Sequence, residues 1–365
     1  FNQPLIYSIA KSLNITTSQA GFAVVIAQIG YGLGLMLLVP LGDLLNKRKL
    51  IVSLMVFAGI SQILLSFSTT LSTLYLFTLC ATFGAISAQV LIPFASSISP
   101  PESSAAIVGK LMSGLVIGII LSRTFAGFVS NYWSWEGVYL SSGVITLLFA
   151  TLMWRKLPNT QPQSDLNIVG IYQSLFQIAQ NNPHLIRRAC AGALGFGILS
   201  MVFTSMTFVL GSVPYFFNDF EIGLFGLLGV IGIYSSSWSG KTVGLGKENL
   251  VAKLCISLML FSCVPLFFAQ QNIWIYAIGV LMSYFGLTAF HVLNQNLVYR
   301  IDAKARSRIN AVYMTIYFSG AALGSLGAVY AWEHWQWQGC VALGLIFAIG
   351  ILWIDRLDFK LMRKN

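Results

Sequence analysis

The chain has 365 residues, of which 56% are hydrophobic and 9% are charged, and its formal net charge is +10. A soluble domain carries roughly 25% charged residues, so this chain has too little polar material to cover a surface that faces water. Its apolar runs approach the roughly 20 residues that a helix needs to cross a bilayer, and they do not alternate like barrel strands. The composition therefore excludes a soluble domain and predicts an all-α membrane protein.

The basic residues, the cysteines and the motifs exclude further classes. Lysine and arginine fall in short loops rather than in one patch, which argues against nucleic-acid binding. The five cysteines lie in apolar runs without a Cys-x-x-Cys spacing, so neither a disulfide framework nor a zinc site is indicated. The sequence has no metal-ligand cluster, catalytic triad or phosphate-binding loop. We therefore expect no enzyme activity, no ATP drive, no metal and no cofactor.

The first apolar run ends near Ala10, and the opening residues do not resemble a signal peptide, so we expect the chain to enter partway along a helix. Together with that remnant, the hydropathy predicts twelve spans, the first of them truncated. The predicted whole spans are 19–41, 50–68, 72–98, 106–130, 137–155, 189–213, 221–238, 249–268, 272–297, 309–331 and 338–355.

An internal repeat divides the chain into two related halves. The segment Trp133-Ser134-Trp135-Glu136-Gly137 is similar to Trp335-Gln336-Trp337-Gln338-Gly339, and the same shift pairs Gly118 with Gly320 and Gln89 with His291. The repeat predicts a six-helix bundle over 1–156, a central loop over 157–188 and a second six-helix bundle over 189–365.

The basic loops predict the orientation. Every lysine and arginine except Lys11 and Arg123 falls on one side of the predicted spans. By the positive-inside rule that side faces the cytoplasm. We therefore expect a cytoplasmic central loop and cytoplasmic N- and C-termini.

The loop after the second span carries an acid, Asp43, followed by the basic pair Lys47 and Arg48. With twelve spans in two halves, this pattern resembles the loop signature of the major facilitator superfamily, although Val39 and Asn46 stand where that family usually has glycine. The pattern favours a cytoplasmic gate, in which the acid pairs with cations or helix ends of neighbouring spans in one conformation. The alternative is a basic anchor with one stray acid.

Small residues four apart mark the fifth span, in a spacing similar to the superfamily's antiporter motif but without its proline. Their side chains permit close helix packing, and glycines repeat the stripe in span eleven. The residues expected to pack in this way are Gly114, Gly118, Ser122, Gly320 and Gly324.

Arg123 lies inside the fifth span, where an arginine costs about 2.5–3.5 kcal/mol on insertion scales. It is therefore interpreted as a cavity cation that binds an anionic or polar substrate, or that shifts the proton affinity of a nearby acid. The alternative is an arginine that extends toward the membrane interface.

Other polar residues fall at cavity depth, but no carboxylate is visible within a span. Gln89 and His291 lie on spans four and ten, which in the superfamily line the central cavity. His291 can titrate near neutral pH, although a lone histidine is more often a structural residue. The further cavity candidates are Asn2, Gln3, Gln28, Tyr31 and Asn294.

Four segments, among them Asn2-Gln3-Pro4-Leu5 and Leu121-Ser122-Arg123-Thr124, are similar to the drug-antiporter and sugar-efflux branch of the superfamily. The resemblance implies a monomeric exporter of the bacterial inner membrane that moves small organic molecules, such as drugs, against protons by alternating access. A metabolite importer, a uniporter and a non-transporting membrane receptor remain as alternatives.

Overall fold

The structure is a computed structural model that describes residues 3–98, 101–159, 167–270, 272–302 and 306–362. Within these ranges, the side chain of Asp43 and most side chains of residues 101–120 lie outside the description. Asn2 lies outside the described residues altogether. The described chain is helical and holds no strand.

The first half of the chain forms membrane-length helices that begin at side-chain caps. Thr16 and Thr70 each form a capping box, and Asn46 and Ser134 accept a hydrogen bond from the first turn of their helices. The elements are η1 (Gln3–Leu5), α1 (Ile6–Leu13), α2 (Thr17–Leu37), η2 (Pro40–Asp43), α3 (Lys47–Ser66), α4 (Leu71–Gly84), α5 (Ser87–Ser97), α6 (Pro101–Tyr132) and α7 (Trp135–Lys156).

The second half repeats this pattern after an additional helix, α8. Its last element, α15, reverses direction at Gln336, where φ is 53° and ψ is −150°, and so provides two antiparallel spans. The elements are α8 (Ile168–Asn181), α9 (Pro183–Leu210), α10 (Asp219–Leu224), η3 (Phe225–Val230), α11 (Ile231–Gly244), α12 (Glu248–Phe261), α13 (Cys263–Phe267), α14 (Ile273–Tyr299) and α15 (Arg306–Met362).

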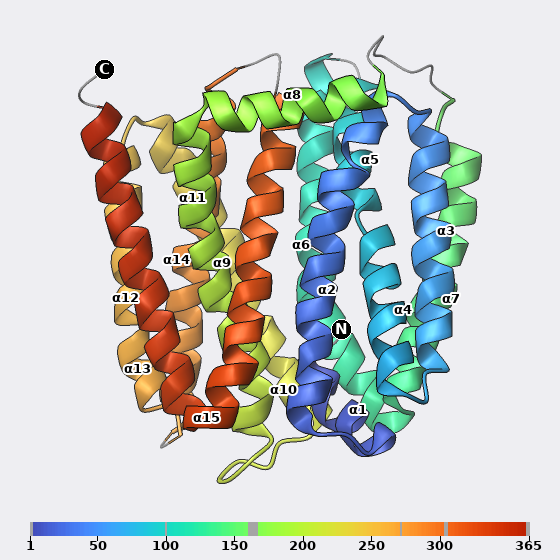
Figure 1. Ribbon diagram of the computed structural model, residues 1–365, viewed down its shortest axis with the longest axis vertical. Helices are drawn as coiled ribbons and strands as arrows, with labels where there is room; N and C mark the ends of the chain where they lie inside the picture. Colours follow the sequence, from blue (N-terminus) through green and yellow to red (C-terminus); the bar gives the residue numbers. More distant parts are fainter. Residues whose placement is uncertain (1–2, 99–100, 160–166, 271, 303–305, 363–365) are drawn as a thin grey trace.

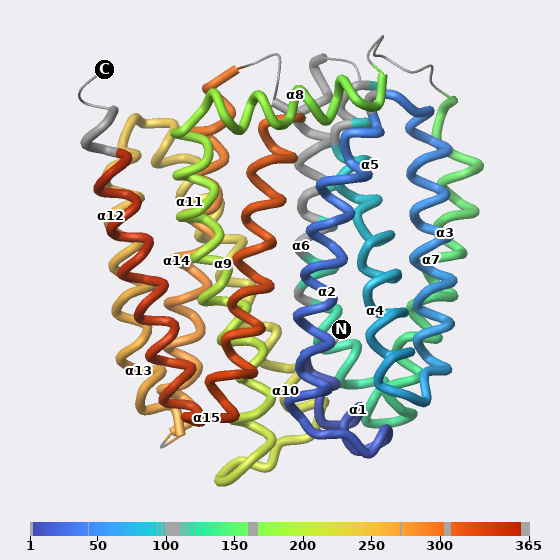
Figure 2. Tube along the Cα trace, in the orientation of Figure 1, coloured from blue at the N-terminus to red at the C-terminus, as the bar shows by residue number. Residues whose placement is uncertain are grey.

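The two halves stand side by side with their helices roughly parallel, and α8 lies across one end of both (Figure 1; Figure 2). We call this end the basic face, because it carries α8 and the predicted basic loops, including Lys47–Lys49 and Arg155–Lys156. The opposite face carries the turns at 14–16, 133–134 and 211–218.

The outside of the molecule is apolar, as expected for helices surrounded by lipid. Phe67 and Trp353, for example, are 69% and 65% exposed. Among the described residues, nine segments are long and apolar enough to span a membrane, and α15 is one of these although it reverses within its length. The predicted all-α membrane fold is confirmed.

The segment predicted as the central loop, 157–188, contains α8 and the first residues of α9, since residues 183–188 are already helical. α9 begins at Pro183, which has no N–H to leave unpaired and is therefore well suited to a first helical turn. Arg187 and Arg188, which the hydropathy leaves in the loop, consequently lie in the first turns of α9.

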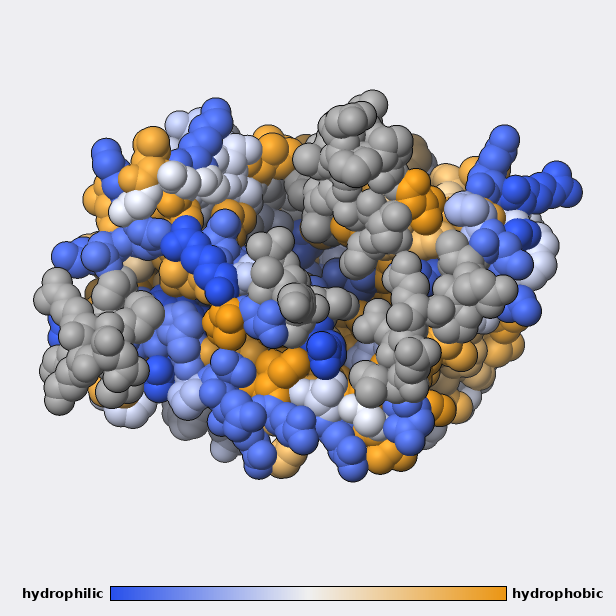
Figure 3. All heavy atoms as spheres, turned by 90° about the horizontal axis from the view of Figure 1, so that it is seen from above, coloured by the Kyte–Doolittle hydropathy of each residue, from blue (hydrophilic) through white to orange (hydrophobic). Residues whose placement is uncertain are grey.

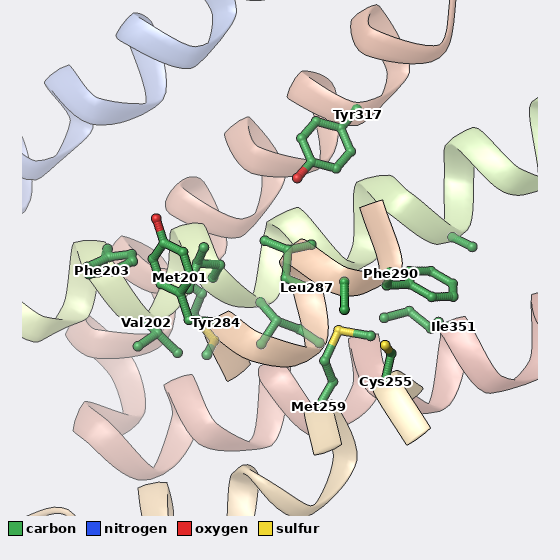
Figure 4. Packing of buried hydrophobic residues seen from close by; sticks show 14 of the residues in the cluster. Met201, Val202, Phe203, Cys255, Met259, Tyr284, Leu287, Phe290, Tyr317 and Ile351 are labelled. Carbon is green, nitrogen blue, oxygen red and sulfur yellow. The ribbon is translucent and has the colours of Figure 1, made fainter. Parts of the chain in front are cut away.

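α9 is the central helix of the second half. Met201, Val202 and Phe203 on it lie among residues of α12 and α14, including Met259 and Leu287 (Figure 4). Close packing against α15 depends on glycine: a Cβ at Gly320 would stand 2.1 Å from the Ala193 carbonyl oxygen, and one at Gly324 would stand 2.1 Å from that of Gly197.

Candidate functional site

Arg123 extends from α6 into the contact between the two halves. Its Nη2 donates to Gln3 Oε1 at 3.2 Å, and its guanidinium carbon lies 4.0 Å from the centre of the Phe203 ring on α9. Nη1 is buried and has no hydrogen-bond partner among the described residues. The arginine is therefore held by an amide and an aromatic face, and no carboxylate in the described part of the chain forms an ion pair with it.

The backbone of the eighth span leaves room for this arginine. A Cβ at Gly226 would stand 2.7 Å from Arg123 Cβ, and one at Gly223 would stand 2.8 Å from the Arg123 carbonyl oxygen. Gly226 belongs to η3, a 3-10 segment in the middle of the span. Such segments often mark hinges. Arg123 thus lies against a place where the span departs from regular helix.

Gln3 links Arg123 of the first half to α9 of the second half. Its side chain accepts from Arg123 on α6, and its carbonyl oxygen accepts from Thr207 Oγ1 on α9 at 2.6 Å. The predicted candidates Gln3 and Arg123 are therefore brought together.

A second group of candidates lies nearer the basic face. Gln89 Nε2 donates to the Tyr31 hydroxyl at 3.2 Å, and the Tyr31 ring lies 4.4 Å from the Phe318 ring of the other half. His291 Nδ1 is 3.1 Å from the Tyr313 hydroxyl, and its ring lies 4.5 Å from that of Tyr317. These residues form an aromatic wall with hydroxyl, amide and imidazole groups.

The remaining cavity candidates are Gln28, Asn294 and Asn2. Gln28 is half-buried on α2, and Asn294 is fully buried on α14 one turn beyond His291. Asn2 lies outside the described residues. The structure therefore does not bring Gln28 into either group.

The basic residues of the expected gate contact aromatic side chains of their own half. Lys47 Nζ lies 5.9 Å from the centre of the Phe94 ring, and the Arg48 guanidinium lies 4.5 Å from that of Trp154. The backbone of Asp43 closes η2, but its side chain lies outside the description.

The small residues of α6 differ in their surroundings: some are exposed, and others contact the second half. Gly114 and Gly118 are exposed, with no described atom within 4 Å of a Cβ built there. Ser122 bonds only within its own helix, to the Ile119 carbonyl. Near the opposite face the helices touch, because a Cβ at Gly127 would stand 2.3 Å from the Asp219 carbonyl oxygen.

The two halves therefore meet near the opposite face along α6, and α2 of the first half also contacts α15 of the second half through Tyr31 and Phe318. Figure 3 views the basic face from above, where hydrophilic side chains surround a hollowed middle. α8 crosses this face and is tied to the first half by the Tyr172 hydroxyl, which donates to the Leu37 carbonyl. Burial raises the pKa of Tyr172, so this hydroxyl stays a donor at neutral pH.

A buried ionic cluster, which hydropathy alone does not reveal, lies at the basic face of the second half. Arg188 Nε donates to Asp358 Oδ2 at 2.6 Å, and its Nη1 donates to Asp355 Oδ1 at 2.9 Å. His184 and Arg187 also contact Asp358. The cluster joins the start of α9 to the end of α15. The paired arginines and the i, i+3 spacing of the two acids were the available signal.

Asp219 is a buried carboxylate at the first residue of α10, near the opposite face. Its side chain on α10 is 7% exposed and accepts hydrogen bonds from Ser8 on α1 and from Ser130 on α6, the latter at 2.7 Å. The hydropathy boundary at 221 placed this residue just outside its span.

Known proteins with the same pattern are transporters. The sequence profile of the Major Facilitator Superfamily matches residues 1–325. The chain is 36% identical over 353 residues to the uncharacterized transporter YgaY of Escherichia coli O157:H7. The matched region covers 96% of this chain and 90% of the relative. It is 27% identical to the probable transporter SCO4007 of Streptomyces coelicolor, over 95% of this chain and 81% of that one.

Solved structures share the fold at low identity. The nucleoside transporter NupG superposes with a TM-score of 0.71 at 15% identity, covering 99% of this chain and 94% of that one. A bacterial homolog of the human lysosomal transporter Spinster, in an inward-facing and unoccupied conformation, superposes with a TM-score of 0.70 at 13% identity, covering 98% and 97%.

Proposed function

Because this chain belongs to the Major Facilitator Superfamily and is a multi-pass membrane transporter, we propose that it exports small organic molecules in exchange for protons. The observation that carries the choice of cargo is Arg123, a cation between the two halves with one buried N–H group that no described residue accepts. The cargo is therefore an anionic or a polar neutral molecule.

Energetics support a binding role for this side chain. A hydrogen bond to a charged group contributes about 1.5–3 kcal/mol, whereas a buried donor without a partner costs about 1–3 kcal/mol. An acceptor on the cargo would remove that cost at Arg123 Nη1, and the Phe203 face would pack against the flat guanidinium. Tyr31, Gln89 and His291 line the path from this position toward the basic face.

Alternating access follows from how the halves meet. We assign the basic face to the cytoplasm by the positive-inside rule, with both termini on that side of the bacterial inner membrane. The hollow of the basic face is then the cytoplasmic entry, and the contact of Gly127 with Asp219 is the periplasmic closure. The moving units are the bundles 1–156 and 189–365, and Asp43, Lys47 and Arg48 close the cytoplasmic side in the other conformation. The working unit is a monomer.

The test measures proton release from the purified full-length protein in lightly buffered detergent as anionic, neutral and cationic compounds are added. We expect release with one charge class, and its loss in Arg123→Ala. Arg123→Lys keeps the charge but not the flat guanidinium, so it should retain the charge preference with weaker binding. Arg300→Lys, an exposed cation paired with Glu248, is the matched control and should behave as the wild type.

Two outcomes would replace the proposal. Proton-independent binding would indicate a uniporter. The direction of transport is tested in inside-out vesicles, because a proton antiporter that exports its cargo accumulates that cargo inside them when the lumen is acidic. Absence of binding and of transport for every compound class would favour a non-transporting receptor.

A further inference from the structure

The two halves are in close contact around Asp219 near the opposite face. Asp219 belongs to α10 of the second half, whereas both of its hydrogen-bond donors, Ser8 and Ser130, belong to the first half. The backbones are also in contact there, at Gly127 and Gly223. This contact must break whenever the halves separate at that face.

No positively charged side chain of the described residues is bound to the Asp219 carboxyl group. At this end of the elements packed here, the titratable or charged side chains are Tyr7 and Lys11 on α1, Arg123 and Tyr132 on α6, and Glu221 on α10 itself. Among the described residues, none of these forms a hydrogen bond or an ion pair with Asp219. Lys11 is exposed, and Glu221 caps its own helix by accepting from the Asn218 N–H.

The two serines suit either protonation state. A hydroxyl both donates and accepts, so Ser8 and Ser130 can donate to an ionised carboxylate, or one of them can accept from a protonated one. A lysine or arginine at either position would instead hold the acid ionised. Closing the contact removes water from a carboxyl group that has no cation, and this disfavours the charged form.

We propose that Asp219 is a proton-binding site that links protonation to closure of the opposite face. The protonated acid enters the contact with Ser8 and Ser130, and the ionised acid favours the separated halves, in which water solvates it. Because α6 carries both Ser130 and Arg123, seven residues or about 10 Å apart along the helix, the proton site and the cargo cation lie on one rigid element. The inference rests on the proposed function only for its role in proton exchange.

The experiment measures the distance between spin labels at the opposite face, without cargo, in lipid nanodiscs from pH 5 to pH 8. Labels go on Tyr132→Cys and Trp274→Cys, each 75% exposed, one in each half. Cys80 and Cys190 become serine, and the three buried cysteines remain. We expect the ratio of short to long distances to fall as pH rises, by at most tenfold per pH unit for one proton.

Matched variants at neighbouring acids decide the assignment. Asp219→Asn is permanently neutral and can bond both serines, so its distances should stay short at every pH. Asp219→Glu keeps a titrating group and should retain a pH response, which also serves if the asparagine variant fails to fold. Glu221→Gln, an exposed acid two residues away, should follow the wild type.

A wild-type response that survives in Asp219→Asn, or distances that do not change with pH in the wild type, would overturn the proposal. Neither result bears on cargo, since none is present. Cargo-linked proton release together with pH-independent distances would leave proton exchange intact and remove Asp219 from it. Distances that change with pH through Asp219, without any cargo-linked proton release, would support the proton-linked closure and contradict the proposed antiport.

Discussion

The packing of α15 on α9 leaves no room for an added methyl group at Gly324. In Gly324→Ala, the new Cβ would stand 2.1 Å from the Gly197 carbonyl oxygen and 2.6 Å from Gly197 Cα. Ordinary contact begins at 3.4 Å, so the two helices must separate by about 1 Å. Both obstructing atoms are backbone and cannot rotate away.

Overpacking of this kind typically costs 1–3 kcal/mol, and the rigid obstruction places this substitution near about 3 kcal/mol. That energy lowers the folding equilibrium about 100-fold, since each 1.4 kcal/mol is a factor of ten. The free energy of unfolding is measured by titrating dodecylsulfate into detergent micelles and following tryptophan fluorescence.

Gly118→Ala is the matched control, because no described atom lies within 4 Å of its added Cβ and alanine favours a helix by about 1 kcal/mol over glycine. We expect it to unfold at or above the wild-type midpoint. If Gly324→Ala unfolds together with Gly118→Ala, the α9–α15 contact is softer than the structure implies and the reasoning fails.

Two further predictions use the same unfolding assay. Asp358→Asn leaves Arg188 partly unpaired at a buried site and should cost about 3–5 kcal/mol, whereas Glu248→Gln breaks only an exposed pair and should cost less than about 1 kcal/mol; equal costs would contradict the role of burial. Trp337→Phe removes the N–H that donates to the Leu266 carbonyl at 2.6 Å and should cost about 1–3 kcal/mol more than Trp135→Phe, whose N–H has no described partner; an inverted order would refute this.

The repeated tryptophans show how far the sequence alone leads. Trp135 and Trp337 are 2% and 1% exposed, and each follows a tryptophan that packs over a glycine, Gly137 or Gly339. The repeat predicted two related halves, and these two tryptophans do occupy equivalent buried positions in them. It did not distinguish their hydrogen bonds, since the acceptor for Trp337 comes from another helix.

The candidate site was predictable in part for the same reason. Arg123 was conspicuous because a charge within an apolar run is costly wherever it lies. Its contacts with Gln3 and Phe203 were not visible, because they depend on which faces of three helices meet.

Hydropathy and repeat spacing are properties of consecutive residues, so the sequence by itself determined the all-helical membrane fold, most span positions and the buried cation. The partners of buried polar groups are properties of helix packing. Asp219 bonds Ser8 across 211 residues of chain, and Arg188 bonds Asp358 across 170. Only the tertiary structure decided these contacts, because in a dry interior each polar group must find its partner wherever the neighbouring helix presents one.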